Sequence, residues 1–225
     1  MEYLVYLLAS FFAVVIVLTL HEFSHAFAAY KCGDPTAKFA GRMSLNPLQH
    51  FDPLGLVAFA VAGFGWAKPV PVNPSNFRNY KSGSFWTSAA GVLTNYVCAF
   101  LFYPLVILTA KYLLVYVQGK YMEIFLGNFV ALLYLYSLNF CVFNLFPLYP
   151  LDGFRIMDTF AKKRGKVYWF LRQYGYYILL GLILINYLAG RFPVLQYINV
   201  FGYAMKWLVK IFGMPITAFW NLIFS

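Results

Sequence analysis

The chain has 225 residues, of which 62% are hydrophobic and 11% charged, with a mean hydropathy of +0.68 and a net charge of +10. Soluble domains carry about 25% charged residues, so this composition excludes a soluble globule and predicts an all-α polytopic membrane protein. The basic residues fall in short stretches between apolar runs, which favours contact with the lipid bilayer over nucleic acid. The three cysteines, Cys32, Cys98 and Cys141, are far apart and predict no disulfide framework.

The first predicted membrane span covers about residues 3–30. The N-terminus before it starts with Glu2 instead of a basic region, and no small-residue cleavage site follows, so we expect a permanent helix and not a signal peptide. Its far end carries the pattern His-Glu-x-x-His at His21, Glu22 and His25. Two histidines four residues apart lie on one face of a helix and can bind one metal ion. Glu22 is then placed to take a proton from a water at that metal, as in zinc hydrolases.

An alternative for the two histidines is a pair of interior side chains bonded to the backbone. Ionisable side chains inside a membrane helix are expensive and usually functional, which favours the metal site. The two histidines are six to ten residues before Lys31. At about 1.5 Å per residue, this places the metal below the membrane surface but not at the midplane.

Residues 31–84 read as a basic cytoplasmic loop. Within it, residues 54–67 are apolar but too few to span a bilayer. They predict either a partly extended re-entrant loop or, equally, a short interfacial helix. His50, in the same loop, is a tempting fourth metal ligand, but a capping or interfacial role is favoured at a position next to Asp52 and Pro53.

The second predicted span covers about residues 85–110. It opens with small side chains, Ser88 to Gly91, which allow close approach to a neighbouring helix. Asn95 follows inside the apolar run. An intramembrane Asn either bonds a neighbouring helix or lines a polar cavity, and helix packing is the favoured interpretation here.

The third predicted span covers about residues 124–146 and ends in a broken segment with two prolines. Pro147 and Pro150 remove backbone donors and end the helix. Asn144 and Asp152 therefore lie beside irregular backbone at membrane depth, which is tolerated where it lines a cavity. Asp152 could instead cap a helix over residues 153–160.

A fourth span is predicted at about 173–189, and residues 194–224 form either a fifth span or an interfacial helix. The basic loops 31–84 and 155–172 hold 12 of the 17 Lys and Arg residues, which places both loops in the cytoplasm and the N-terminus outside.

This topology brings His21, His25 and Asp152 to the same side of the membrane and to a similar depth. We therefore predict one Zn²⁺ ion on these three ligands, with a fourth position left for water. Glu22 is the predicted general base, and Asn144 is the predicted donor to the developing oxyanion.

The pairing of His21-Glu22-Phe23-Ser24-His25 with Asn144-x-x-Pro147-x-x-Pro150-Leu151-Asp152-Gly153 resembles the site-2 protease family of intramembrane zinc metalloproteases. Residues 46–55 (NPLQHFDPLG) are similar to its compact bacterial branch without PDZ or CBS domains. The resemblance implies zinc on His21, His25 and Asp152, acid/base catalysis by Glu22 and assistance from Asn144.

The same resemblance implies a three-helix catalytic core within residues 1–160 of a single membrane domain, with cleavage on the cytoplasmic side. It also implies an edge strand near residues 63–66 that could pair with substrate. The family commonly has Gly-Pro in the second-helix motif, whereas Gly91 is followed here by Val92.

The predicted function is that of an intramembrane zinc endopeptidase of the cell membrane, which cuts single-pass transmembrane proteins during regulated intramembrane proteolysis. The alternative is a membrane transporter or ion-binding protein that uses the His/Asp cluster. A transporter predicts internal repeats and has no need of Glu22 between the histidines. An inactive scaffold is a third reading, against which the intact Glu22 argues.

Overall fold

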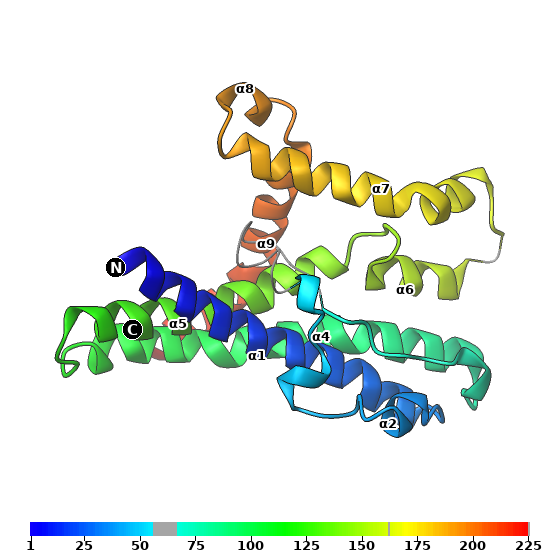
Figure 1. Cartoon of the computed structure of the whole chain (residues 1–225), viewed down its shortest axis with the longest axis horizontal. Coiled ribbons are helices and arrows are strands. Elements are labelled where there is room, and N and C mark those ends of the chain that lie inside the picture. Colours follow the sequence, from blue (N-terminus) through cyan, green and yellow to red (C-terminus); the bar gives the residue numbers. More distant parts are fainter. Residues whose placement is uncertain (56–66, 162, 225) are drawn as a thin grey trace.

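The computed structural model describes residues 1–55, 67–161 and 163–224, and the regular secondary structure of this part of the chain is helical. Its centre is a bundle of three long helices that lie side by side along the longest axis of the molecule (Figure 1). They are α1 (Glu2–Lys31), α4 (Tyr80–Leu108) and α5 (Lys120–Asn144). Large apolar side chains also cover their outer faces, which is typical of helices in contact with lipid.

Four helices in the described part are long and apolar enough to cross a membrane. They are α1, α4 continued by the π-helical turn η3 (Thr109–Leu113), α5, and α9 (Val200–Phe224). The prediction of an all-α polytopic membrane protein is confirmed at this level.

The direction of the three bundle helices follows from their end contacts. Glu2 Oε1 accepts from Lys120 Nζ at 2.5 Å, so α1 and α5 begin at the same end and α4 runs in the opposite direction. Between α1 and α5, small and branched side chains form a core in which Ala13 and Val17 pack against Leu132 and Leu133. The carboxyl end of α1 and the broken segment after α5 therefore lie at the same end of the bundle.

The second and third predicted spans have displaced boundaries. Helix α4 begins at Tyr80, five residues before the expected position, because the Asn79 side chain caps it by accepting from the Ser82 N–H at 3.0 Å. Helix α5 begins at Lys120 and ends at Asn144, two residues before the expected end. The hydrophobic pattern marks only the apolar part of a span and not its polar first turn. Both helices therefore begin earlier than this pattern predicts.

After the bundle, the described residues form helices α6 (Asp152–Phe160), α7 (Lys166–Ala189), α8 (Pro193–Gln196) and α9. Helix α7 contains the predicted helix 173–189 and starts seven residues earlier. It is not among the four candidate spans, since Gln173, Asn186 and several tyrosines dilute its apolar residues. Membrane crossing by residues 173–189 stays a prediction, whereas α9 meets the criterion for a span.

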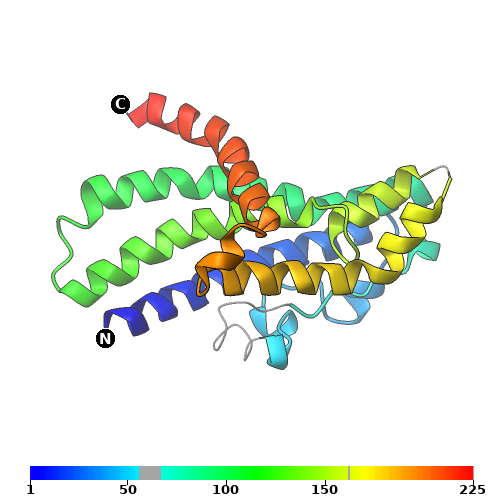
Figure 2. The ribbon, with the colours of Figure 1, turned by 90° about the horizontal axis from the view of Figure 1, so that it is seen from above.

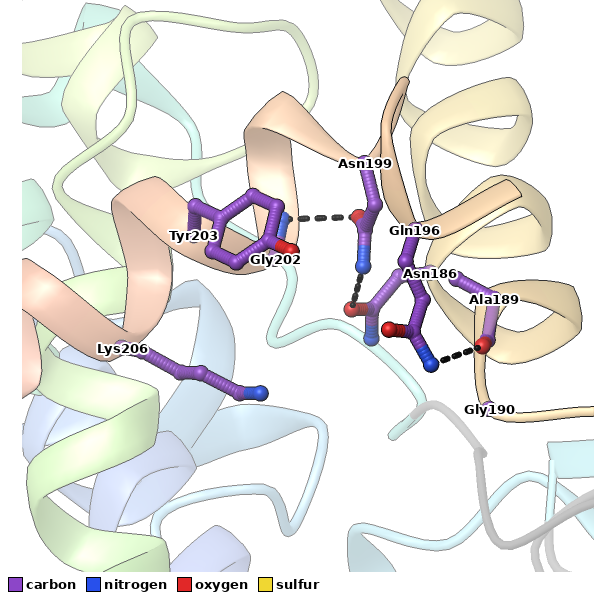
Figure 3. Close-up of a pocket in the computed structure, with 8 residues that line it drawn as sticks. All are labelled: Asn186, Ala189, Gly190, Gln196, Asn199, Gly202, Tyr203 and Lys206. Atoms are coloured by element: carbon purple, nitrogen blue, oxygen red, sulfur yellow. Dashed lines mark hydrogen bonds between the residues drawn. The ribbon is translucent and has the colours of Figure 1, made fainter. Parts of the chain in front are cut away.

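A short polar junction joins α7 to α9 (Figure 3). Asn199 Nδ2 donates to Asn186 Oδ1 at 3.0 Å, and Asn199 Oδ1 accepts from the Gly202 N–H at 2.9 Å. The junction borders a cavity of about 200 Å³, which Lys206 also lines. From there α9 crosses α4 and α5 (Figure 2), and Trp220 Nε1 donates to the Phe100 carbonyl at 2.8 Å. Helix α9 is thus held against the bundle where it crosses α4 and α5.

The described part of the loop between α1 and α4 includes the short helices α2 (Thr36–Phe39), η1 (Pro47–Gln49) and η2 (Pro74–Asn76). Most of the predicted re-entrant loop, residues 56–66, and the predicted edge strand at 63–66 lie outside the described residues. In the described ranges on either side, an isolated antiparallel bridge joins Phe51 to Ala67, and no strand is present there.

Candidate metal centre

Three side chains that are far apart in the sequence converge at the end of the bundle. His21 and His25 lie one turn apart on α1, and Asp152 is the first residue of α6. The two Nε2 atoms are 3.0 Å apart, and Asp152 Oδ2 lies 3.4 Å from that of His21 and 3.1 Å from that of His25. All three residues are buried.

These separations fit a single metal ion. Zinc bonds of about 2.0–2.2 Å in tetrahedral geometry place neighbouring ligand atoms about 3.3 Å apart. Of the His, Cys, Asp and Glu side chains in the described residues, these three lie close enough together to hold one ion. Two neutral imidazoles and one carboxylate are a typical donor set for catalytic zinc.

The Asp152 carboxylate supports the same conclusion. Its Oδ2 is buried and accepts no hydrogen bond from a described residue. The N-cap residue of α6 is Leu151, with no side-chain cap, so Asp152 points to the histidines and does not cap the helix. A buried carboxylate oxygen without a donor is costly unless a cation binds it. The alternative of Asp152 as a simple helix cap is therefore wrong.

Gly91 of α4 makes room for the two histidines. A Cβ atom at this position would lie 2.5 Å from His25 Nε2 and 2.7 Å from His21 Nε2. The expected close approach of the small residues of α4 to a neighbouring helix is confirmed here. The space left by the missing side chain adjoins the two atoms that would bind the metal.

Each histidine has a partner on α4 behind its ring. His25 Nδ1 lies 2.7 Å from the Thr87 carbonyl oxygen, and His21 Nδ1 lies 2.9 Å from the Asn95 side-chain amide. Sequence reasoning identified neither contact. Thr87 contributes its backbone carbonyl, which any residue could provide, so the sequence does not mark this position. Asn95 does stand out in the sequence, because an Asn within an apolar run is unusual.

Glu22 lies beside the three converging residues but outside the group. It is half-buried, and its Oε2 accepts from the Val70 backbone N–H at 3.2 Å. The loop segment that follows the undescribed residues therefore holds the carboxylate from one side. Its other oxygen, Oε1, accepts no hydrogen bond from a described residue. This arrangement suits a proton acceptor better than a metal ligand.

Two further predicted residues are placed as follows. Asn144 ends α5, and its Nδ2 donates to the Phe140 carbonyl of its own helix at 3.1 Å. Its role toward an oxyanion stays a prediction. His50 is fully buried, and its Nε2 lies 2.7 Å from the Ser44 carbonyl oxygen. His50 organises its loop and is not part of the converging group.

Comparison with known proteins agrees with this centre. The profile of a protein family described as Peptidase family M50 matches residues 9–186. This chain belongs to peptidase family M50. The resemblance to site-2 proteases is thereby confirmed at the level of the family.

Two relatives of this M50 chain carry the same kind of name. "Putative zinc metalloprotease YwhC" of Bacillus subtilis (strain 168) is 40% identical over 149 residues, which is 64% of this chain and 65% of that protein. "Putative zinc metalloprotease Rip2" of Mycolicibacterium smegmatis is 28% identical over 211 residues, 91% of this chain and 77% of that protein. The chain thus covers slightly less than two thirds of YwhC. No solved structure is significantly similar to this chain.

Proposed function

We propose that this M50 chain is an intramembrane zinc endopeptidase that hydrolyses peptide bonds of single-pass transmembrane proteins. The observation that carries the proposal is the convergence of His21, His25 and Asp152 at 3.0–3.4 Å, with Glu22 next to them on α1. His21 Nε2, His25 Nε2 and Asp152 would hold the ion. A zinc ion bound there would supply a Lewis acid and lower the pKa of a water toward about 7.

Side chains of the protein itself carry out the proton transfer and stabilise the oxyanion. Glu22 takes a proton from the attacking water and returns it to the leaving amine, for which a half-buried carboxylate held beside the three ligands is suited. Asn144 donates to the developing oxyanion after its amide leaves the Phe140 carbonyl. The irregular segment after α5 gives water and an unwound substrate access to the site, because a substrate helix hides its carbonyls.

The proposed location is the cell membrane, with the site on the cytoplasmic side. The bilayer and the substrate are the partners that this assignment requires. Both basic loops leave the bundle at the end that carries the site, as the carboxyl end of α1 and the end of α6 show (Figure 1). Positive loops face the cytoplasm in multi-pass proteins.

The substitution Glu22→Gln tests the assignment. It removes the general base and keeps the ligands, so zinc content should stay at one ion per chain while cleavage of a tagged single-pass substrate falls by about 10²–10⁴-fold. Glu123→Gln, an exposed glutamate in the first turn of α5, is the matched control and should cleave as wild type. Unchanged cleavage by Glu22→Gln would refute the protease proposal and favour an ion-binding or transport role.

A further inference from the structure

Asn95 is an unusual residue for the middle of an apolar helix. It lies on α4 one turn after Gly91, has no solvent exposure, and reaches across to α1. Its side-chain amide lies 2.9 Å from His21 Nδ1, and its Oδ1 is buried without a hydrogen-bond donor among the described residues. A buried amide oxygen without a partner is unfavourable, so the arrangement calls for an explanation.

The chemistry of the imidazole supplies one. A neutral histidine carries its proton on one ring nitrogen and a lone pair on the other. His21 Nε2 faces Asp152 and His25, where a metal requires the lone pair. The proton must then be on Nδ1, which becomes a donor, and its partner must be an acceptor.

Asn95 can provide that acceptor by a half-turn of its amide. The oxygen and the nitrogen of a carboxamide exchange places in such a turn. With Oδ1 directed at His21, the Nδ1–H has an acceptor, and the orphaned oxygen has a donor. One rotation thus pairs His21 Nδ1–H with Asn95 Oδ1, and the amide nitrogen takes the position that the oxygen leaves.

His25 shows the same design in a fixed form. Its Nδ1 faces the Thr87 backbone carbonyl at 2.7 Å, and a carbonyl oxygen can only accept. His25 must therefore carry its proton on Nδ1 and present the Nε2 lone pair to the centre. Helix α4 thus places an oxygen acceptor behind each of the two rings, one from the backbone and one from a side chain.

We propose that Asn95 is a positioning residue for His21, and this inference rests on the proposed metal site. Its amide oxygen accepts from His21 Nδ1–H and holds the ring in the tautomer and orientation that bind metal through Nε2. Gly91, one turn earlier on the same face of α4, allows the helices to approach closely enough for this contact.

Zinc affinity of the purified protein in detergent tests the proposal without an activity assay. Asn95→Leu keeps the size of the side chain but removes the acceptor, and should weaken zinc binding about 10–100-fold in competition with a chromophoric chelator. Asn95→Asp keeps an acceptor and loses the amide donor, so it should retain the affinity of wild type. Asn128→Leu is the matched control, because the Asn128 amide donates to the Ile124 carbonyl of its own helix. Its affinity should not change.

A spectroscopic measurement reports the tautomer of His21 directly and complements the zinc affinities. Long-range ¹⁵N correlation of the three histidines in the zinc-loaded protein should show His21 protonated on Nδ1 in wild type and in Asn95→Asp. Thermal unfolding of the metal-free variants reports any loss of folding separately.

The outcomes are distinct. Equal loss of affinity in Asn95→Asp and Asn95→Leu, or wild-type affinity in Asn95→Leu, overturns the positioning role. His21→Ala decides the underlying site, since wild-type zinc affinity in that variant would refute the metal centre itself. Loss of zinc by His21→Ala together with normal binding by Asn95→Leu refutes only the inference about Asn95.

Discussion

At the residue scale, the centre depends on atoms placed within a few tenths of an ångström. His21, His25 and Asp152 come from two elements, and their ligand atoms lie 3.0–3.4 Å from one another. The Nδ1 atoms of both rings have partners on α4. Groups on α4 that contact the histidines and do not bind the metal are therefore as important to the geometry as the ligands.

Gly91→Ala is expected to damage the centre. The added Cβ would lie 2.5–2.7 Å from the two Nε2 atoms, so one histidine must move. Overpacking of this kind costs about 1–3 kcal/mol, which corresponds to a loss of zinc affinity of about 5–150-fold. Chelator competition measures this loss.

Gly181→Ala is the control for that substitution. A Cβ at Gly181 of α7 would meet nothing within 4 Å, so this variant should bind zinc as wild type and gain up to about 1 kcal/mol of helix stability. Wild-type zinc affinity in Gly91→Ala would contradict the described packing of α4 on α1.

At the element scale, Asp34 ties the end of α1 to the segment before α4. Its carboxylate is fully buried and accepts from the Asn73 N–H at 2.7 Å and from Asn76 Nδ2 at 2.8 Å, and it also accepts from Thr36. Burial opposes ionisation of this carboxyl, but the hydrogen bonds from Thr36, Asn76 and Asn73 outweigh it and hold the pKa below its ordinary value of 3.8. The loop is thus fixed where it passes Glu22.

Stability should depend on this carboxyl in a defined pH range. Because the folded pKa is depressed, Asp34 contributes stability above the unfolded pKa of about 4, and this contribution disappears as pH falls through the lower folded pKa. Asp34→Asn directs an amide N–H₂ at an N–H donor and should lose about 1–3 kcal/mol at pH 7.

The measurement is the unfolding temperature of both proteins in detergent between pH 7 and pH 3. The difference between wild type and Asp34→Asn should shrink toward the acid end. Asp52→Asn removes the same charge from a more exposed turn, where Oδ1 accepts from the Leu54 and Gly55 N–H groups, and should have a smaller effect. A difference that does not change with pH would contradict the described network.

At the scale of the whole molecule, the three bundle helices alternate in direction and α9 crosses two of them (Figures 1 and 2). Both chain ends lie at the end of the bundle opposite the candidate centre. Lys111 Nζ there donates to the Phe224 carbonyl at 3.3 Å, and Glu2 pairs with Lys120. The distribution of basic residues predicts that this end faces outward.

Cys32 provides a direct test of that orientation. It follows α1 at the end near the centre and is partly exposed, whereas Cys98 and Cys141 are buried in the bundle. A membrane-impermeant maleimide should label Cys32 in inverted vesicles and not in intact cells. Burial raises the pKa of the Cys32 thiol, so a mildly alkaline buffer is suitable. Cys32→Ser should abolish the labelling, and labelling of intact cells would reverse the orientation.

The sequence by itself determined what depends on local spacing and composition. A separation of four residues places His21 and His25 on one helix face, and long apolar runs mark α1, α4 and α5 as candidate spans. Charge counting also predicted that Asp152 reaches the same end as the histidines. The three bundle helices, and the end at which the three candidate ligands meet, follow from these features.

Only the tertiary structure decided which helix faces meet. Helices α1 and α4 are apolar around their whole circumference, so their periodicity does not indicate which side turns toward the other. The small residues and Asn95 mark one face of α4 as unusual, but only the packing shows that this face brings Gly91, Thr87 and Asn95 against the two histidines. Contacts within one helix are fixed by sequence spacing, whereas contacts between helices depend on the packing of the whole chain.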